Sequence, residues 1–330
     1  MKNILKVSDI QNLMNKDVNS AFLQKYTAEL WLVLMTILWG GTFVIIKNSL
    51  NYSSPMMFIG IRFSVAFLCL LPFLYFKRKI IKKGAVISGA LLGLLMFFSF
   101  STQTSGLKYT SATKSAFLTG SCVVIVPFVQ TFIEKRFPTK GSIIGIIFVF
   151  AGIVFLSSGG SSLINIFIEL GNNFNFGDFL TIISALLFAF HIVYLDIVSS
   201  KHNYLVITAS QIFICAVAGF IFSYFFNLLQ IENTSLIFNS NLLAGIIYTA
   251  IFATVITTTV QTKFQKEVTP SKAGIIYSFE PIFAALFAYF LLNEKMTNFG
   301  IIGCTLIFSG LIISEIFDSL FANGYNKKKS

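Results

Sequence analysis

Apolar segments of about twenty residues follow one another through most of this 330-residue chain, separated by short polar connections. Twenty residues of α-helix are about 30 Å long, which matches the hydrocarbon core of a bilayer. Hydrophobic residues make up 55% of the chain and charged residues only 11%, whereas about a quarter of a soluble domain is charged. The pattern predicts an all-α polytopic membrane protein with ten transmembrane helices, at 29–47, 55–76, 85–105, 110–132, 140–158, 178–199, 204–226, 241–261, 271–292 and 298–317.

The net charge of +11 comes from basic residues that lie mainly in alternate connections between these segments. If the N-terminus is cytoplasmic, the tails and connections on the cytoplasmic side hold 19 of the 24 lysines and arginines. Cytoplasmic loops of membrane proteins carry this excess, whereas nucleic-acid binding needs a basic face on a soluble fold. We therefore predict a multi-pass protein of the cell (inner) membrane, in contact with the lipid bilayer and not with nucleic acid, with both termini in the cytoplasm.

The second half of the chain repeats the first. A shift of 160 residues lays 111–135 over 271–295, and a shift of 149 pairs Trp39 with Phe188. Each half contains five of the ten segments. Because five is odd, the second half enters the membrane from the opposite side, so the repeat is inverted and a binding site is expected near the midplane.

Four units follow from this division. Repeat 1 spans 29–158 and repeat 2 spans 178–317. Residues 1–28 lack the apolar core of a signal peptide and are expected to be a cytoplasmic tail, either an interfacial helix or a disordered segment. Residues 318–330 are expected to be a basic cytoplasmic tail.

Four stretches of the sequence are characteristic in their order and spacing: LWGGTFVIIK at 38–47, SATKSAFLTGSCVVIVPF at 111–128, FEPIFAALFAYFLLNEK at 279–295 and GCTLIFSG at 303–310. In these stretches the chain resembles the EamA-type transporters of the drug/metabolite transporter superfamily. The resemblance implies two inverted five-helix repeats in which helices 1, 3, 4, 6, 8 and 9 surround a central cavity that works by alternating access. It implies no particular substrate, because family members carry amino acids, vitamins such as riboflavin, and other metabolites.

Glu280 and Pro281 lie near the middle of the ninth segment. A carboxylate at that depth costs about 2.5–3.5 kcal/mol on insertion scales, so it is expected to face other helices or a wet cavity. Three roles are open for Glu280: a proton-coupling group, a partner for a substrate amine, or half of a fixed ion pair. Pro281 lacks a backbone donor and predicts a distortion of the helix beside the site. The counterpart of Glu280 in the first repeat is Gly120, so only one half supplies the charge.

Two basic residues lie inside the predicted helices. Arg62 either anchors a substrate carboxylate or phosphate, or pairs structurally with Glu280 or with freed carbonyls. The structural role is favoured, because the resemblance places helix 2 at the periphery of the cavity. Lys114 stands about one turn inside the fourth segment, where it either attracts an anionic substrate group or extends to the lipid headgroups.

Five uncharged or titratable residues complete the candidate site. His191, midway along the sixth segment, either relays protons or makes a core hydrogen bond. Gln103 and the polar residues beside it in the third segment either line a wet pathway or join helices by hydrogen bonds. Thr119 flanks Lys114 in the fourth segment. Trp39 and Tyr277 lie in helices that the resemblance puts at the cavity, and their rings either stack on a planar substrate or pack in the core.

We therefore predict a secondary transporter that moves a small metabolite across the cytoplasmic membrane, with protons as the candidate coupling ion. The sequence contains no GxxxxGK[ST] motif, which argues against ATP as the energy source. Its four cysteines lie in apolar segments without CxxC spacing, so no cofactor or metal is expected. The alternative is an intramembrane enzyme in which Glu280 and His191 act as acid and base. The sequence specifies no oligomeric state.

Overall fold

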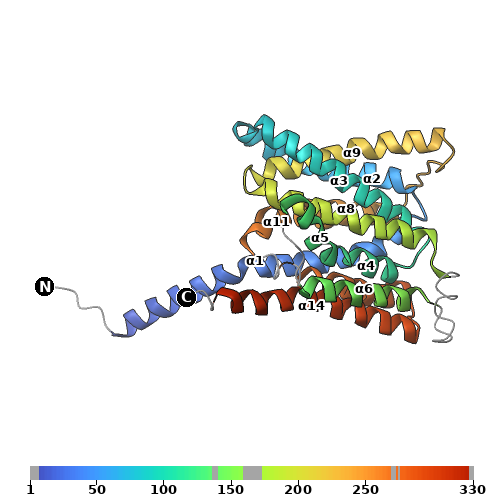
Figure 1. The fold of residues 1–330 in the computed structure, drawn as a ribbon. Helices are drawn as coiled ribbons and strands as arrows, with labels where there is room; N and C mark the ends of the chain where they lie inside the picture. Colours follow the sequence, from blue (N-terminus) through green and yellow to red (C-terminus); the bar gives the residue numbers. More distant parts are fainter. Residues whose placement is uncertain (1–6, 136–139, 159–172, 269–272, 274–275, 327–330) are drawn as a thin grey trace.

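The computed structural model describes residues 7–135, 140–158, 173–268, 273 and 276–326. Helices account for nearly all of these residues and lie side by side in one bundle (Figure 1). The helices, in chain order, are α1 Val7–Ser49, α2 Pro55–Phe76, α3 Lys83–Leu107, α4 Ala112–Gly120, α5 Cys122–Glu134, α6 Lys140–Ser157, α8 Phe176–Ser199, α9 Tyr204–Leu228, α10 Ser240–Ile247, the π-helix η2 Tyr248–Ile256, α11 Thr257–Phe264, α13 Glu280–Leu292 and α14 Asn298–Asn326. Two 3₁₀ turns, Arg78–Ile80 and Gln265–Glu267, connect neighbouring helices.

Within the described residues, eight segments are long and apolar enough to cross a bilayer, and two shorter apolar helices follow them. The shorter two are α13 and the first part of α14, Asn298–Ser314. These ten elements follow the order of the ten apolar segments, which confirms the predicted all-α membrane fold. Most of the first third of the ninth predicted segment, 271–292, lies outside the described residues.

Helical structure continues into both predicted tails. α1 begins at Val7, well before its apolar part starts at Thr27. Its N-terminal portion extends beyond the rest of the bundle (Figure 1). α14 likewise runs past 317 to Asn326.

Three of the predicted spanning helices are interrupted. The fourth is divided at Ser121 into α4 and α5, and the eighth passes through the π-helix η2. In the ninth, a turn at Ser278 and Phe279 precedes α13, because Pro281 has no N–H to continue the helical hydrogen bonds. Interrupted backbone inside a membrane is tolerated only where protein or water satisfies the freed groups. The interruptions therefore mark where polar groups gather.

The helices pack as an inverted repeat requires. α2 packs against α9, and α6 packs against α14, and in each pair the two helices are counterparts in the two repeats. The contacts of α1 with α13 are matched by those of α8 with α4 and α5. Exchanging the two halves therefore returns the same set of neighbours.

Glycines allow the closest of these contacts, between α6 and α14. A Cβ at Gly145 would lie 2.7 Å from the carbonyl oxygen of Gly310, and a Cβ at Gly310 would lie 2.7 Å from that of Gly145. Gly152 and Gly303 make the same reciprocal contact, again at 2.7 Å. Side chains at these positions would force the two backbones apart, which is why small residues are enriched where membrane helices touch.

Candidate functional site

The two interrupted helices that correspond in the repeat meet at their breaks. Gly120 ends α4, and a Cβ at this position would lie only 2.6 Å from Cγ of Pro281. The absence of a side chain at Gly120 thus makes room for the proline at the start of α13. This contact places Glu280, the first residue of α13, beside the break between α4 and α5.

A cavity of about 70 Å³ lies beside these breaks and between the two halves. Its walls come from α1 to α5 in the first half and from α8, α11, α13 and the turn before α13 in the second. Both repeats therefore contribute to one central space. Seven of the eight residues singled out from the sequence line it, namely Trp39, Arg62, Gln103, Thr119, His191, Tyr277 and Glu280.

Glu280 is the carboxylate of this cavity. Its side chain is half-buried, and within the described part of the chain it forms no hydrogen bond and no ion pair. The N-terminus of α13 favours a negative charge at this position by about 0.3–1 kcal/mol. That is less than the cost of about 2.5–3.5 kcal/mol of placing a carboxylate at the centre of a bilayer. A proton, water or a cationic ligand group is therefore needed to satisfy it.

Arg62 is the cation of this cavity, and only 1% of its surface is exposed. Nε donates to Oγ1 of Thr254 at 2.9 Å, and Nη2 donates to the carbonyl oxygen of Ala253 at 3.2 Å, both in η2. The guanidinium also lies over the ring of Phe100, at 4.9 Å from the centroid. No carboxylate among the described residues lies within 4 Å of it, and Nη1 forms no hydrogen bond to them.

These contacts correspond to one of the structural roles considered for Arg62, that of a partner for backbone carbonyls. It binds a backbone carbonyl of the π-helix, and the described structure shows no ion pair with Glu280. The resemblance implies that helix 2 lies at the periphery, and in the structure α2 packs mainly against α9. The guanidinium nevertheless lines the cavity. Arg62 is the lining residue that α2 contributes, and its long side chain brings the guanidinium to the cavity.

Two amide side chains hold neighbouring polar groups at the cavity wall. Nε2 of His191 lies 3.0 Å from Oε1 of Gln211, and both side chains are buried. Nε2 of Gln103 donates to Oγ1 of Thr119 at 3.2 Å, joining α3 to α4. The hydrogen bonds considered for His191 and Gln103 are thus present, and His191, Gln103 and Thr119 all border the cavity.

Aromatic rings form the remaining walls. The rings of Trp39 and Tyr277 lie 6.2 Å apart at an angle of 54°, and those of Phe100 and Phe188 lie 5.1 Å apart, nearly perpendicular. Each pair joins one half of the bundle to the other. Tyr277 is further held by its hydroxyl, which donates to Oε1 of Gln265 at 3.3 Å.

Lys114 lies apart from this cavity. Its Nζ is 2.5 Å from Oδ2 of Asp178, at the ends of α4 and α8. The side chain is 13% exposed, and that of Asp178 is fully buried. Lys114 is therefore an ion-pair partner in this conformation, a role that the sequence did not suggest, because Asp178 follows it by 64 positions.

Phe100, Phe188 and Cys122 line the cavity and were not singled out from the sequence as site residues. The repeat contained a signal for one of them, since Phe188 is the counterpart of Trp39. Cys122 follows the break at Ser121, which periodicity alone does not reveal. Among the described residues, no group of three His, Cys, Asp or Glu side chains has the arrangement of a metal site.

Comparison with known proteins agrees with this architecture. The EamA-like transporter family model matches residues 26–158 and 175–315. An uncharacterized transporter of Archaeoglobus fulgidus is 30% identical over 88% of this chain and 86% of its own length. The uncharacterized transporter YoaV of Bacillus subtilis is 23% identical over 86% of this chain and 95% of its own. A crystal structure 14% identical in sequence superposes with a TM-score of 0.64 over 89% of this chain and 98% of that one.

Proposed function

The chain belongs to the EamA-like transporter family, and from this premise we propose that it is a secondary transporter that carries a small metabolite across the cytoplasmic membrane by alternating access. The observation that carries the proposal is the cavity between the inverted halves, which holds one guanidinium and one carboxylate without partners of opposite charge. Buried charges are normally paired. A substrate that supplies both counter-charges satisfies them together.

The substrate class follows from this pair. A zwitterion with a carboxylate and an ammonium group binds Nη1 of Arg62 at one end and Glu280 at the other. Trp39, Tyr277 and Phe188 offer aromatic faces for an apolar side chain. An amino acid meets all of these requirements. Riboflavin fits less well, because it is planar but carries neither charge.

Alternating access follows from the size of the cavity. About 70 Å³ is room for only a few water molecules, since one water needs about 10–15 Å³ on this measure. A metabolite enters only if the two halves move apart on one side. The proposed coupling ion is a proton on Glu280, which takes the place of the substrate ammonium when the site returns empty.

Catalysis receives less support than transport. The alternative of an intramembrane enzyme rests on Glu280 and His191, and both line the cavity. His191, however, is held by the amide of Gln211, whereas a general base is usually oriented by a carboxylate. The curated relatives cited above are also named as transporters.

The test is uptake by the purified protein in liposomes. We expect saturable flux of zwitterionic amino acids, and loss of that flux when the carboxylate is amidated or the amine is removed. Arg62→Met and Glu280→Gln should each reduce the flux at least tenfold, whereas Lys295→Gln, at an exposed position, should leave it unchanged. An absence of flux for the whole panel, with riboflavin included, would overturn the proposal. So would equal flux in the wild type and both cavity variants.

A further inference from the structure

Polar contacts join the two halves at one end of the bundle. We call this the distal end: it is the end at which α1 stops and α2 starts, opposite to the start of α1 and the end of α14 (Figure 1). The distribution of basic residues predicts that it faces the outside of the cell. Among the residues that the structure describes, we consider three connections between the repeats there, and each involves a carboxylate of the second repeat.

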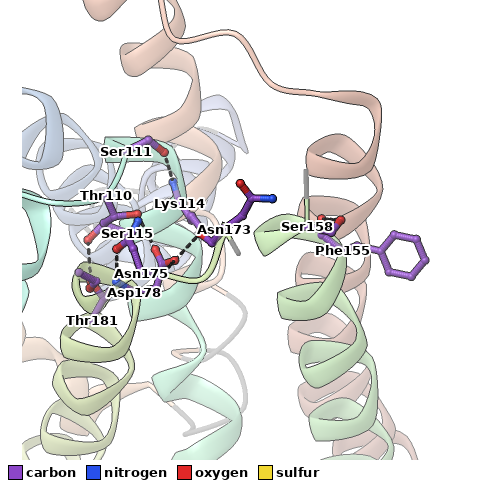
Figure 2. A network of polar contacts seen from close by, with 11 residues as sticks. Thr110, Ser111, Lys114, Ser115, Phe155, Ser158, Asn173, Asn175, Asp178 and Thr181 are labelled. Atoms are coloured by element: carbon purple, nitrogen blue, oxygen red, sulfur yellow. Dashed lines mark hydrogen bonds and ion pairs between the residues drawn. The ribbon is translucent and has the colours of Figure 1, made fainter. Parts of the chain in front are cut away.

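Asp178 forms the first connection. Its Oδ1 accepts a hydrogen bond from Oγ1 of Thr110 at 2.6 Å, and its Oδ2 lies 2.5 Å from Nζ of Lys114 (Figure 2). The same oxygen accepts the backbone N–H of Asn175 at 3.0 Å, which completes the cap of α8. Thr110 and Lys114 belong to the first repeat and Asp178 to the second. Next to them, the hydroxyls of Ser115 and Thr181 lie 3.4 Å apart.

Glu294 forms the second connection, from the link between α13 and α14. Its carboxylate accepts the backbone N–H groups of Ala112 and Thr113 at 2.8 and 3.1 Å, and the hydroxyl of Thr113 at 2.9 Å. A carboxylate of the second repeat thus caps the first turn of α4, where the helix dipole favours a negative charge. Next to it, within the first repeat, Nζ of Lys47 donates to the carbonyl oxygens of Leu107 and Thr110.

The third connection joins the loop after α1 to the loop after α9. The N–H of Ser54 donates to the carbonyl oxygen of Ser235 at 3.0 Å, and that of Ile237 to the carbonyl oxygen of Tyr52 at 2.7 Å. Oε1 of Glu232 accepts the N–H of Met56 at 3.2 Å. This connection is mostly between backbone groups, whereas the first two depend on single side chains.

The side-chain connections differ in kind from the contacts that hold the bundle together. α6 and α14 touch through glycines at backbone distance, and separating them would leave voids. Asp178, Glu294 and Lys114 instead join helix ends at the distal end of the bundle, where the side chain of Lys114 is 13% exposed. Water can replace these partners when the ends separate, so breaking them costs much less than opening a packed core. They are therefore suited to break and re-form in each cycle.

We propose that the ion pair of Lys114 with Asp178 and the cap of Glu294 on α4 form a latch that keeps the cavity closed toward the distal end. The latch joins α4, which ends at the cavity with Gly120, to α8 and to the far end of α13, which begins at the cavity with Glu280. Release of the latch lets these ends separate and opens the cavity to the distal side. This inference rests on the proposed alternating access.

A native cysteine reports on the latch. Cys122 lines the cavity, and Cys69→Ala, Cys215→Ala and Cys304→Ala together leave it as the single thiol. A membrane-impermeant maleimide added to intact cells labels Cys122 only when the cavity opens to the outside, and the same reagent on inside-out vesicles measures opening to the other side.

Loss of one latch partner should raise labelling from outside. For Lys114→Gln, Asp178→Asn and Glu294→Gln we expect an increase of about tenfold, which corresponds to about 1.4 kcal/mol in the opening equilibrium. Labelling in inside-out vesicles should not rise. The double variant of Lys114 and Asp178 should exceed neither single variant by much, because both lose the same contact. Lys295→Gln removes an exposed charge next to Glu294 and serves as the matched control.

Unchanged labelling from outside in all three variants would overturn the latch. So would an equal rise from both sides, which together with a lower melting temperature would show that the cluster is only a structural brace. Neither result bears on whether the wild type transports zwitterions in liposomes. Conversely, a failure to find any transported substrate leaves the labelling result intact, so the two proposals fail separately.

Discussion

Replacement of Arg62 by lysine should destabilise the protein more than replacement by methionine, although lysine keeps the charge. Lysine cannot make both of the hydrogen bonds that the guanidinium donates, to Oγ1 of Thr254 and to the carbonyl oxygen of Ala253. A hydrogen bond from a charged donor is worth about 1.5–3 kcal/mol, and the ammonium can remake one of the two. The buried charge remains. We expect Arg62→Lys to lower the free energy of unfolding by about 2 kcal/mol.

Methionine loses the same two hydrogen bonds but also removes the charge. A basic side chain at this depth costs about 2.5–3.5 kcal/mol on insertion scales, and this gain offsets most of the loss. The carbonyl oxygen of Ala253 is left without its donor, whereas Oγ1 of Thr254 keeps its bond to the carbonyl oxygen of Thr249 at 2.7 Å. Arg62→Met should therefore stay within about 1 kcal/mol of the wild type.

Thermal unfolding of the purified variants in one detergent measures this difference. About 2 kcal/mol corresponds to a melting temperature roughly 3 °C lower for a chain of 330 residues. The opposite order, with the lysine variant as stable as the wild type and the methionine variant unfolded, would refute the reasoning. It would mean that the charge of Arg62, paired with a carboxylate such as Glu280, matters more than its hydrogen bonds to η2.

Three further predictions concern packing and titration. Gly303→Ala should lower the free energy of unfolding by about 1–3 kcal/mol in the same assay, because the new Cβ would lie 2.5 Å from the backbone nitrogen of Leu156. The control is Gly300→Ala, whose Cβ would lie 3.3 Å from its nearest neighbour, Oγ1 of Thr297, and which should have little effect. Glu280→Gln should make transport in liposomes independent of pH, and a retained pH profile would remove Glu280 as the proton site. Burial raises the pKa of Glu232 in the loop after α9 above 4.5, against the opposing effects of the Met56 N–H and Lys108. The raised pKa means that folding favours the protonated form of Glu232. The wild type should therefore lose stability relative to Glu232→Gln as the pH rises through the pKa of this group in the folded protein. Melting temperatures of the two proteins that change in parallel across pH 4–7 would contradict this.

Local properties of the sequence account for most of the fold. Spanning length, apolar content and the positions of prolines belong to single segments, and the ten segments were found in their correct order for this reason. The interruption before Glu280 was expected, because Pro281 cannot continue the hydrogen-bonding pattern. The break at Ser121 was not expected, and in the structure it lies next to the contact of Gly120 with Pro281 in the other repeat.

The candidate site was only partly accessible from sequence. Ionisable or amide groups inside apolar segments are expensive, so Arg62, Gln103, His191 and Glu280 stood out, and all four border one cavity. Their roles in transport remain predictions. Lys114 stood out on the same grounds but pairs with Asp178 instead. Burial cost identifies a polar residue that needs a partner, but it does not identify the partner.

A membrane bundle built from two inverted halves could be predicted from the sequence, because segment length, charge distribution and self-similarity can be counted along the chain. Which side chains of different helices meet became visible only in the folded bundle. In a bilayer both the lipid-facing and the protein-facing sides of a helix are apolar, so the rotation of a helix about its axis leaves little trace in its pattern. The contact of Gly120 with Pro281, the hydrogen bonds of Arg62 to η2 and the ion pair of Lys114 with Asp178 are consequences of that rotation.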